Sequence, residues 1–186
     1  ARGAGERVAR RAGGAGGVRA GGAAPVVGAA AANRGVARFP RCIAGKYGAL
    51  SRSGRATSAI TTSDDIRRGD HAGTFQIPTR PWELIQLGNC GSPIETDVGW
   101  LGLTHGVGAM RTYSIGAMLL DLDDPTRVVG TLDEPLLVPE RDEQDGYVPN
   151  VVYTCGALVH DDTLLIPYGI ADSSIGMAKV SLGALI

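Results

Sequence analysis

The chain has 186 residues, a length that allows one medium domain with a sizeable core or a piece of a larger one. Its 18 basic and 19 acidic residues leave a net charge of -1, so the charge gives no sign of a nucleic-acid or anionic membrane partner. No apolar run approaches the roughly 20 residues of a membrane-spanning helix. Three widely spaced cysteines without a CxxC pair fit reduced thiols, and we expect a cytoplasmic protein.

The first 36 residues differ from the rest in composition. Of these positions 22 are Ala or Gly, and six are Arg against one acid, Glu6. Such a segment cannot bury enough apolar area to offset its ordering entropy. We interpret residues 1–36 as disordered or as a mistranslated reading frame upstream of the true coding sequence, with a low-complexity linker as the alternative. Residues 37–186 form the expected domain.

From residue 37 onward, short β-type runs alternate with Gly and Asp turn signals, and helical periodicity is nearly absent. The expected strands, in chain order, are 42–50, 58–62, 100–105, 114–121, 127–130, 151–160, 163–168 and 174–180. Many short strands at roughly regular spacing predict an all-β sandwich, barrel or propeller. The runs 100–105 and 163–168 are each followed by Gly and look like equivalent parts of two successive sheets.

The densest set of polar and aromatic residues runs from Pro81 to Arg111, as PWELIQLGNCGSPIETDVGWLGLTHGVGAMR. Its glycines permit close backbone approach beside polar groups, which ligand-binding loops often require. Ordinary β-turns are the simpler explanation.

Four segments carry a resemblance to a known family. They are FPRCIAGKY at 39–47, GNCGSPIET at 88–96, GWLGLTHGVGAMRTYSIGAMLLDLDDP at 99–125 and GYVPNVVYTCGAL at 146–158. In this order they resemble glycoside hydrolase family 130, which contains β-mannoside phosphorylases and some β-1,2-mannosidases on a five-bladed β-propeller. The resemblance implies that about three blades are present here, the last three-fifths of such an enzyme.

The resemblance also implies inversion at a β-mannoside, with inorganic phosphate or water attacking the anomeric carbon. Lys46 and His105 match the family's phosphate-contacting positions, and Arg111 and Tyr113 are candidates for the rim of the same anion site. A lysine gives a compact charge and a histidine a directed N–H. The alternatives are a solvated lysine, a core histidine, an ion-paired arginine and a packed tyrosine.

Other polar residues are candidates for contact with the sugar. Asp172 matches a family acid that faces the sugar, although it equally fits an Asp that opens a turn. Four residues of the 88–97 loop are expected to meet sugar hydroxyls: Asn89, Ser92, Glu95 and Asp97.

No residue of this chain can be assigned as the catalytic acid. In the family that acid is an Asp from the N-terminal half of the propeller, where this chain has the leader with Glu6 as its single carboxylate. The acidic runs 121–124 and 140–145 fit turns better than calcium loops, so we expect no metal and no cofactor beyond inorganic phosphate as co-substrate.

The sequence thus predicts a carbohydrate-active enzyme, or a fragment of one, that cleaves β-mannoside oligosaccharides by inverting phosphorolysis to mannose 1-phosphate. Two alternatives stay open, a β-mannoside hydrolase of the same family and a non-catalytic, truncated sugar-binding fragment. Another five-bladed glycosidase is a third. A three-blade piece exposes strand edges, so we expect self-association and consider a homo-oligomer.

Overall fold

The computed structural model describes residues 26–28, 35–52 and 57–186, except for the side chains of residues 70–72. Most of the predicted leader, residues 1–25 and 29–34, lies outside the described residues. Within its described part, Val27 donates to the Arg67 carbonyl at 2.8 Å and accepts from the Gly69 amide at 3.0 Å. This piece of the leader therefore contacts the domain. Among the described residues, no helix has the length and apolar character to cross a membrane.

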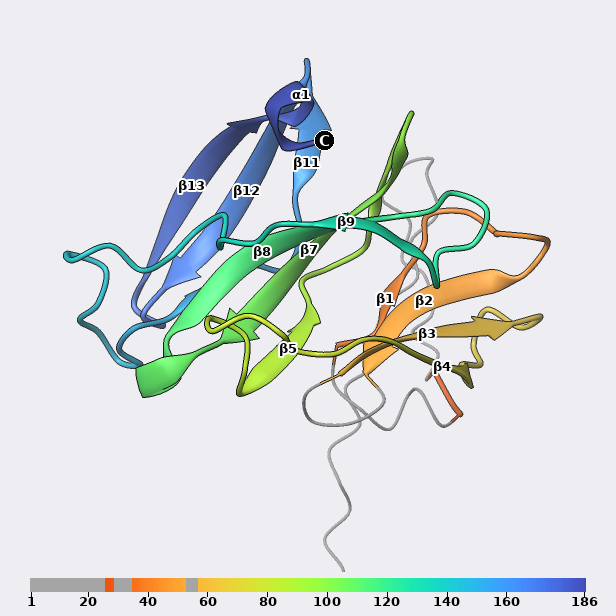
Figure 1. Ribbon diagram of the computed structural model, residues 1–186, viewed down its shortest axis with the longest axis horizontal. Coiled ribbons are helices and arrows are strands. Elements are labelled where there is room, and N and C mark those ends of the chain that lie inside the picture. Colours follow the sequence, from red (N-terminus) through yellow and green to blue (C-terminus); the bar gives the residue numbers. More distant parts are fainter. Residues whose placement is uncertain (1–25, 29–34, 53–56) are drawn as a thin grey trace, which may run out of the picture.

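Three antiparallel sheets make up the described part of the chain (Figure 1). Sheet 1 has the strand order β1-β2-β3-β4. Its strands are β1 (Ala37–Arg38), β2 (Tyr47–Arg52), β3 (Ser58–Ser63) and β4 (Asp70–Gln76). The turn before β2 has Ala44 and Gly45 in the left-handed region, so Lys46 directly follows a tight turn.

Sheet 2 has the order β5-β7-β8-β9, and β6 also pairs with β7. Its strands are β5 (Gln86–Asn89), β6 (Ile94–Thr96), β7 (Gly99–Val107), β8 (Tyr113–Leu120) and β9 (Val128–Thr131). A short 3-10 helix, η2 (Ala109–Arg111), lies in the turn between β7 and β8. All nine residues of β7 are buried, because this strand has neighbouring strands at both edges and a sheet against each face.

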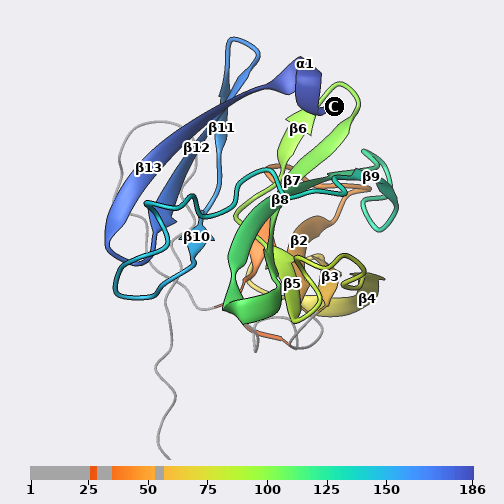
Figure 2. The same cartoon turned by 60° about the vertical axis from the view of Figure 1, so that its left-hand side comes forward.

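Sheet 3 has the order β10-β12-β11 with β13 pairing along β12. Its strands are β10 (Val152–Tyr153), β11 (Leu158–His160), β12 (Thr163–Ile170) and β13 (Ser174–Ser181), followed by the short helix α1 (Leu182–Leu185). In the turned view, β6 and β11 lie toward α1, whereas β5 and β10 lie toward the opposite end (Figure 2).

Sheet 2 lies between the other two sheets, and its two faces belong to different core clusters. Trp100 and Met118 pack with Leu50 of sheet 1. Leu101 and Leu103 pack with Ile166 and other side chains of sheet 3. This division follows from the two-residue repeat of a strand, which sends neighbouring side chains of β7 to opposite faces.

Most predicted strands are confirmed. The strands β7 and β12 hold equivalent places, because β7 pairs with β5, the first strand of sheet 2, and β12 pairs with β10, the first strand of sheet 3. Two boundaries were wrong. The strand predicted at 42–50 begins only at Tyr47, because a turn occupies its first half. The strand predicted at 151–160 is divided into β10 and β11. It is interrupted at Thr154, because the hydroxyl of this residue donates to the Gly156 carbonyl at 2.8 Å and to the Pro167 carbonyl at 2.7 Å.

The Trp82 side chain covers two glycines of sheet 2. A Cβ on Gly106 would lie 2.4 Å from the Trp82 ring, and one on Gly116 would lie 2.5 Å from it. The indole donates to the Asp133 carbonyl at 2.9 Å. Glycines 106 and 116 of the sequence motifs are therefore required by this close packing of the indole on β7 and β8.

Candidate functional site

Segments at the start of each sheet contact the next sheet, and we call this series of contacts between sheets the line. Arg41, in the loop after β1, donates to both carboxylate oxygens of Glu95 on β6 at 2.6 to 3.0 Å. Gly91, just after β5, lies so close to the chain after β10 that its Cβ would be 2.3 Å from the Cys155 carbonyl oxygen. Polar side chains from all three sheets can therefore meet along this line.

The line has two ends, which we name by one residue each. The Tyr113 end contains β5, β10 and the β7–β8 turn, because Gln86 pairs with Val107 and Tyr113 bridges to Val151. The Glu95 end contains β6, β11 and the 39–46 loop, because Arg41 pairs with Glu95 (Figure 2).

His105 lies on β7 toward the Tyr113 end and is only 4% exposed. Its ring fills the space beside Gly88, where a Cβ would lie 2.6 Å from His105 Cε1. Nε2 of Gln86 lies 3.1 Å from His105 Nε2, and Sγ of Cys90 lies 3.6 Å from Nδ1. Burial, aided by the charge of Arg52, lowers the pKa of His105 to about 4. The imidazole is therefore neutral near pH 7 when no ligand is bound.

Two tyrosines flank this imidazole. The Tyr113 ring on β8 stacks parallel to it with centroids 6.3 Å apart, and the Tyr153 ring on β10 lies at 5.1 Å with a tilt of 56°. Burial raises the pKa of Tyr153 to about 12, so its hydroxyl keeps its proton. Neither tyrosine hydroxyl forms a side-chain hydrogen bond with another described residue, which leaves both as donors for a ligand.

Arg52 and Asn89 adjoin the same group. A Cβ on Gly35 would lie 3.5 Å from Arg52 Cδ and 3.7 Å from Asn89 Oδ1, so both side chains flank this glycine. Asn89 is 3% exposed, and its Oδ1 has no hydrogen-bond partner among the described residues. We call His105, Gln86, Tyr113, Tyr153 and Arg52 the His105 cluster.

Lys46 lies at the other end. Its ammonium is half exposed and pairs with Asp64 at 3.3 Å. It precedes β2, whereas Arg52 is the last residue of β2, and the six residues of that strand span roughly 17 Å at about 3.3 Å each. No hydrogen bond, ion pair or ring contact joins Lys46 to His105 in the part of the chain that the structure describes. Their joint contact with phosphate therefore stays a prediction from the sequence.

Of the candidates in the 88–97 loop, only Asn89 adjoins the His105 cluster. The Glu95 carboxylate is held by Arg41, whose hydrogen bond lowers the pKa of Glu95, and the Arg41 guanidinium lies 4.8 Å above the Trp100 ring. Asp97 is exposed in the β6–β7 turn, and Ser92 is exposed between β5 and β6. Their sugar contacts stay predictions.

The two remaining candidates lie in exposed turns at the Tyr113 end. Arg111 has φ 57° in the β7–β8 turn, next to Tyr113. Ala171 and Asp172 have φ 48° and 53°, and the Ser173 amide donates to the Ile170 carbonyl at 2.9 Å, so Asp172 lies in the tight turn between β12 and β13. Asp172 thus has the turn role that the sequence left open, and its turn follows Ile170, the partner of Val152 on β10.

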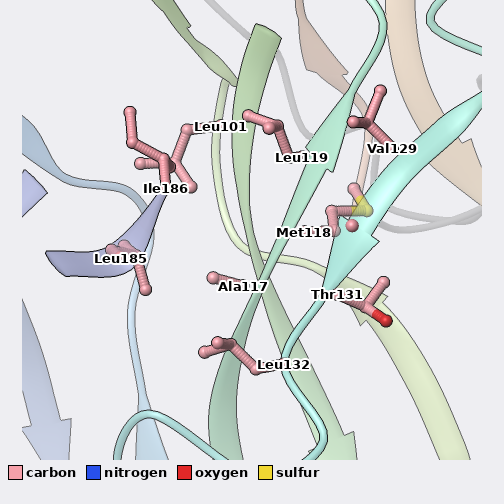
Figure 3. A pocket seen from close by; sticks show the side chains of 10 residues that line it. Leu101, Ala117, Met118, Leu119, Val129, Thr131, Leu132, Leu185 and Ile186 are labelled. Carbon is pink, nitrogen blue, oxygen red and sulfur yellow. The ribbon is translucent and has the colours of Figure 1, made fainter. Parts of the chain in front are cut away.

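An apolar cavity of about 250 Å³ lies elsewhere, between sheet 2 and the C-terminal residues (Figure 3). Leu185 and Ile186 line one side, and residues of β7, β8 and β9, including Leu101, Ala117 and Val129, line the others. It contains no titratable side chain and is separate from the His105 cluster.

The His105 cluster combines a guanidinium, two phenol hydroxyls and a neutral imidazole. This set offers several hydrogen-bond donors and one permanent positive charge, which suits an oxyanion. No carboxylate hydrogen-bonds to His105, Tyr113 or Tyr153 within the described ranges. The cluster can hold an anion but supplies no carboxylic acid for proton transfer.

Comparison with known proteins identifies the family. The family model for β-1,4-mannooligosaccharide phosphorylases of glycoside hydrolase family 130 matches residues 28–186. The chain belongs to glycoside hydrolase family 130. The resemblance read from the sequence is therefore confirmed.

Curated proteins that are similar to this chain include phosphorylases. A 1,2-β-oligomannan phosphorylase of Thermoanaerobacter sp. is 40% identical over 152 residues, which are 81% of this chain and 51% of the relative. A β-1,4-mannooligosaccharide phosphorylase of Ruminococcus albus is 39% identical, covering 83% and 50% respectively. The chain spans about half the length of the curated relatives it matches.

A solved family-130 structure agrees with the fold. The β-1,2-mannobiose phosphorylase of Listeria innocua, in complex with β-1,2-mannobiose, matches with a TM-score of 0.75 at 36% identity, over 82% of this chain and 45% of that one.

Three residues of the His105 cluster were not predicted from the sequence. Tyr153 stands inside the quoted family-130 segment 146–158, and Arg52 and Gln86 each lie within two to five residues of a quoted segment. The sequence shows these three residue types, but it does not show that they lie near His105. Their position depends on pairing between strands that are far apart in the chain.

Proposed function

We propose that this chain is part of an enzyme that cleaves β-mannosides by inverting phosphorolysis and releases mannose 1-phosphate. The observation that carries the proposal is the placement of His105 between Tyr113 and Tyr153, close to Arg52, in a chain of family 130. The curated relatives described above are phosphorylases, which favours phosphate over water as the nucleophile.

Phosphate fits this cluster by charge and by hydrogen bonding. The guanidinium supplies charge and a fork of donors, and the two phenols supply further O–H groups. A neutral imidazole can donate one N–H, and a bound dianion would raise its pKa. The group can thus hold one phosphate oxygen toward a sugar while the others are bound.

In the proposed reaction a phosphate oxygen forms a bond to the anomeric carbon while the glycosidic C–O bond breaks on the opposite face. The departing oxygen takes a proton from a carboxylic acid. We propose that this acid comes from the part of the relatives that this chain does not match. The residues of this chain would bind and orient the two substrates.

We also propose the architecture of the whole enzyme. The three sheets correspond to about three blades of a five-bladed β-propeller, with the line next to its central channel. Sugar contacts are proposed for Asn89, Ser92, Glu95, Asp97 and Asp172. Asn89 and Asp172 have the better support, because both belong to the Tyr113 end.

The test uses a chimera in which residues 28–186 replace the matching part of the Thermoanaerobacter relative. The chimera is incubated with β-1,2- or β-1,4-mannobiose, with and without phosphate. We expect phosphate-dependent mannose 1-phosphate, and a His105→Gln chimera should lose most of it. Release of free mannose at the same rate without phosphate would instead establish the hydrolase alternative.

A non-catalytic sugar-binding role is the second candidate, and it is favoured because no carboxylate hydrogen-bonds to His105 among the residues that the structure describes. The chain alone should then bind mannobiose without cleaving it. A chimera that folds, binds mannobiose and releases neither product would support this role and contradict the enzymatic one.

A further inference from the structure

A loop at residues 139–150 connects sheet 2 to sheet 3 and passes the Tyr113 end (Figure 1). On the side of sheet 2, the Tyr113 amide donates to the Asn150 carbonyl at 2.9 Å. On the side of sheet 3, the Val148 amide donates to the Ala171 carbonyl at 2.9 Å. The loop is therefore fastened both to the start of β8 and to the turn between β12 and β13.

Side chains of the loop also hold it in place. The Glu143 carboxylate accepts from the Tyr168 hydroxyl at 2.9 Å and from the Glu140 amide at 3.1 Å. The Gln144 side chain donates to the Pro139 carbonyl at 3.3 Å. Because these bonds already order the loop, little conformational freedom is left to lose when a ligand binds to it.

Tyr147 is a large side chain of this loop that none of these bonds uses. It is 86% exposed, and its hydroxyl has no hydrogen-bond partner among the residues that the structure describes. Gly146 before it packs on the β12–β13 turn, where an added Cβ would lie 2.5 Å from the Ala171 Cβ. Val148 after it is bonded to the same turn. The backbone of Tyr147 is therefore fixed beside the turn that contains Asp172.

A second exposed apolar residue lies in the turn that leads to Tyr113. Met110, in the β7–β8 turn, is also 86% exposed, and no large hydrophobic residue in the described ranges is more exposed than these two. The carboxylate of Asp172 has no ion-pair or hydrogen-bond partner within the same ranges. The Tyr113 end thus offers apolar contact surface next to hydrogen-bonding groups.

A pyranose ring needs this combination, because its faces carry C–H groups and its edge carries hydroxyls. Tyr147 lies three residues before Asn150, at most about 11 Å of extended chain, and Asn150 bonds to Tyr113 of the His105 cluster. A sugar at Tyr147 is therefore outside the His105 cluster but within reach of an oligosaccharide that occupies it.

We propose that Tyr147 stacks on the third sugar unit of a β-mannoside oligosaccharide, beyond the two units that meet at the cleaved bond, and that Asp172 accepts from hydroxyls of that unit. The preferred substrates are then oligosaccharides of three or more units. The inference rests on the proposed function for the kind of sugar.

The experiment measures the binding of mannobiose and mannotriose to the 186-residue chain by isothermal titration calorimetry, without phosphate. Each sugar is used in its β-1,2-linked and its β-1,4-linked form. The variants are Tyr147→Ala, Tyr147→Phe and Asp172→Asn. Tyr47→Ala is the matched control, because Tyr47 is a 38% exposed tyrosine that begins β2, directly after the 39–46 loop of the Glu95 end.

We expect the wild type to bind mannotriose more tightly than mannobiose. Tyr147→Ala should weaken mannotriose binding about fivefold or more and leave mannobiose within about twofold of the wild type, because only the third unit loses its aromatic contact. Tyr147→Phe keeps the ring and should stay within about twofold for both sugars. Asp172→Asn, which suits the left-handed turn, should weaken mannotriose binding about threefold or more. Tyr47→Ala should change neither affinity by more than about twofold.

Circular dichroism checks that each variant folds, as the exposure of Tyr147 leads us to expect. Tyr147→Gln replaces Tyr147→Ala if the latter does not fold. Wild-type affinity for mannotriose in the folded variant would overturn the inference. Equal losses for mannobiose and mannotriose, or a wild type that gains nothing from the third unit, would overturn it as well.

Failure of this inference is distinguishable from failure of the proposed function, because the calorimetry involves no turnover. Mannotriose binding that depends on Tyr147 supports the inference even if the chimera releases no mannose 1-phosphate. An active chimera together with mannotriose binding that ignores Tyr147 contradicts the inference and leaves the proposed function standing.

Discussion

The His105 ring occupies the space that a side chain at position 88 would need, with Cε1 only 2.6 Å from where a Gly88 Cβ would lie. The glycine of the GNCGS segment therefore has a definite role. It lets an imidazole from β7 reach across the first strand of sheet 2 toward Tyr153.

Gly88→Ala should displace His105 from between its two tyrosines. We expect a loss of about 1–3 kcal/mol in the free energy of unfolding, the usual cost of overpacking. Urea unfolding measures it, and the His105 imidazole signal should shift. Gly130→Ala on β9 is the control, because nothing lies within 4 Å of its added Cβ. Equal effects from both variants would show that the contact with His105 is unimportant.

The low pKa of His105 makes stability depend on pH. Between pH 6.5 and about 4 the unfolded imidazole binds a proton and the folded one does not. Acidification through this window therefore favours unfolding, by up to about 1.4 kcal/mol per pH unit from this group. His105→Gln should have a flatter profile of unfolding free energy against pH. His160→Gln, at an exposed hairpin, should keep the wild-type slope. Parallel profiles for wild type and His105→Gln would contradict a buried neutral imidazole.

Glu83 is a buried carboxylate that fixes the segment carrying Trp82. It is 1% exposed, accepts from the Thr79 amide at 2.9 Å and from the Arg80 amide at 3.2 Å, and pairs with the Arg80 guanidinium at 3.5 Å. All of these donors contact Oε1, so Glu83→Gln can keep an acceptor there, but it removes the buried negative charge that the Arg80 guanidinium pairs with. We expect a loss of about 2–4 kcal/mol, measured as a lower urea midpoint with an unchanged m-value.

Glu134→Gln provides the control for this substitution, because Glu134 is exposed. It should change the unfolding free energy by less than about 0.5 kcal/mol. A Glu83→Gln variant as stable as Glu134→Gln would mean that the Trp82 segment does not depend on the carboxylate.

The edge strand β13 is expected to cause self-association. Ile175 is 84% exposed and Met177 is 59% exposed on a strand paired on one side by β12. An unprotected apolar edge favours pairing with a second copy. The double variant Ile175→Thr with Met177→Thr should lower the associated fraction in sedimentation velocity. Met110→Thr, in the β7–β8 turn and equally exposed, should leave it unchanged. A wild type that sediments as a monomer at all concentrations would refute this expectation.

Strand positions were largely predictable because runs such as 100–105 and 163–168 combine β-branched or apolar residues with flanking turn signals. The short first strands were not. β5 and β6 are only four and three residues long and are separated by Pro93 and Gly91, so the local pattern indicates a loop. Their pairing depends on the long neighbour β7, which no window of local sequence reveals.

The candidate site was predictable in residue type but not in grouping. Lys46 and His105 were paired because both match family positions. Lys46, however, directly precedes β2 and pairs with Asp64, whereas His105 lies within β7 between two tyrosines. Which end of β2 approaches β7 is set by the register and order of the sheets. Arg52 could be recognised only after that arrangement was known.

The most direct test is a crystal structure of this chain grown with inorganic phosphate. The account predicts a phosphate ion bounded by the Arg52 guanidinium, the His105 imidazole and the Tyr153 hydroxyl. An ordered phosphate at Lys46 with none near His105 would contradict it.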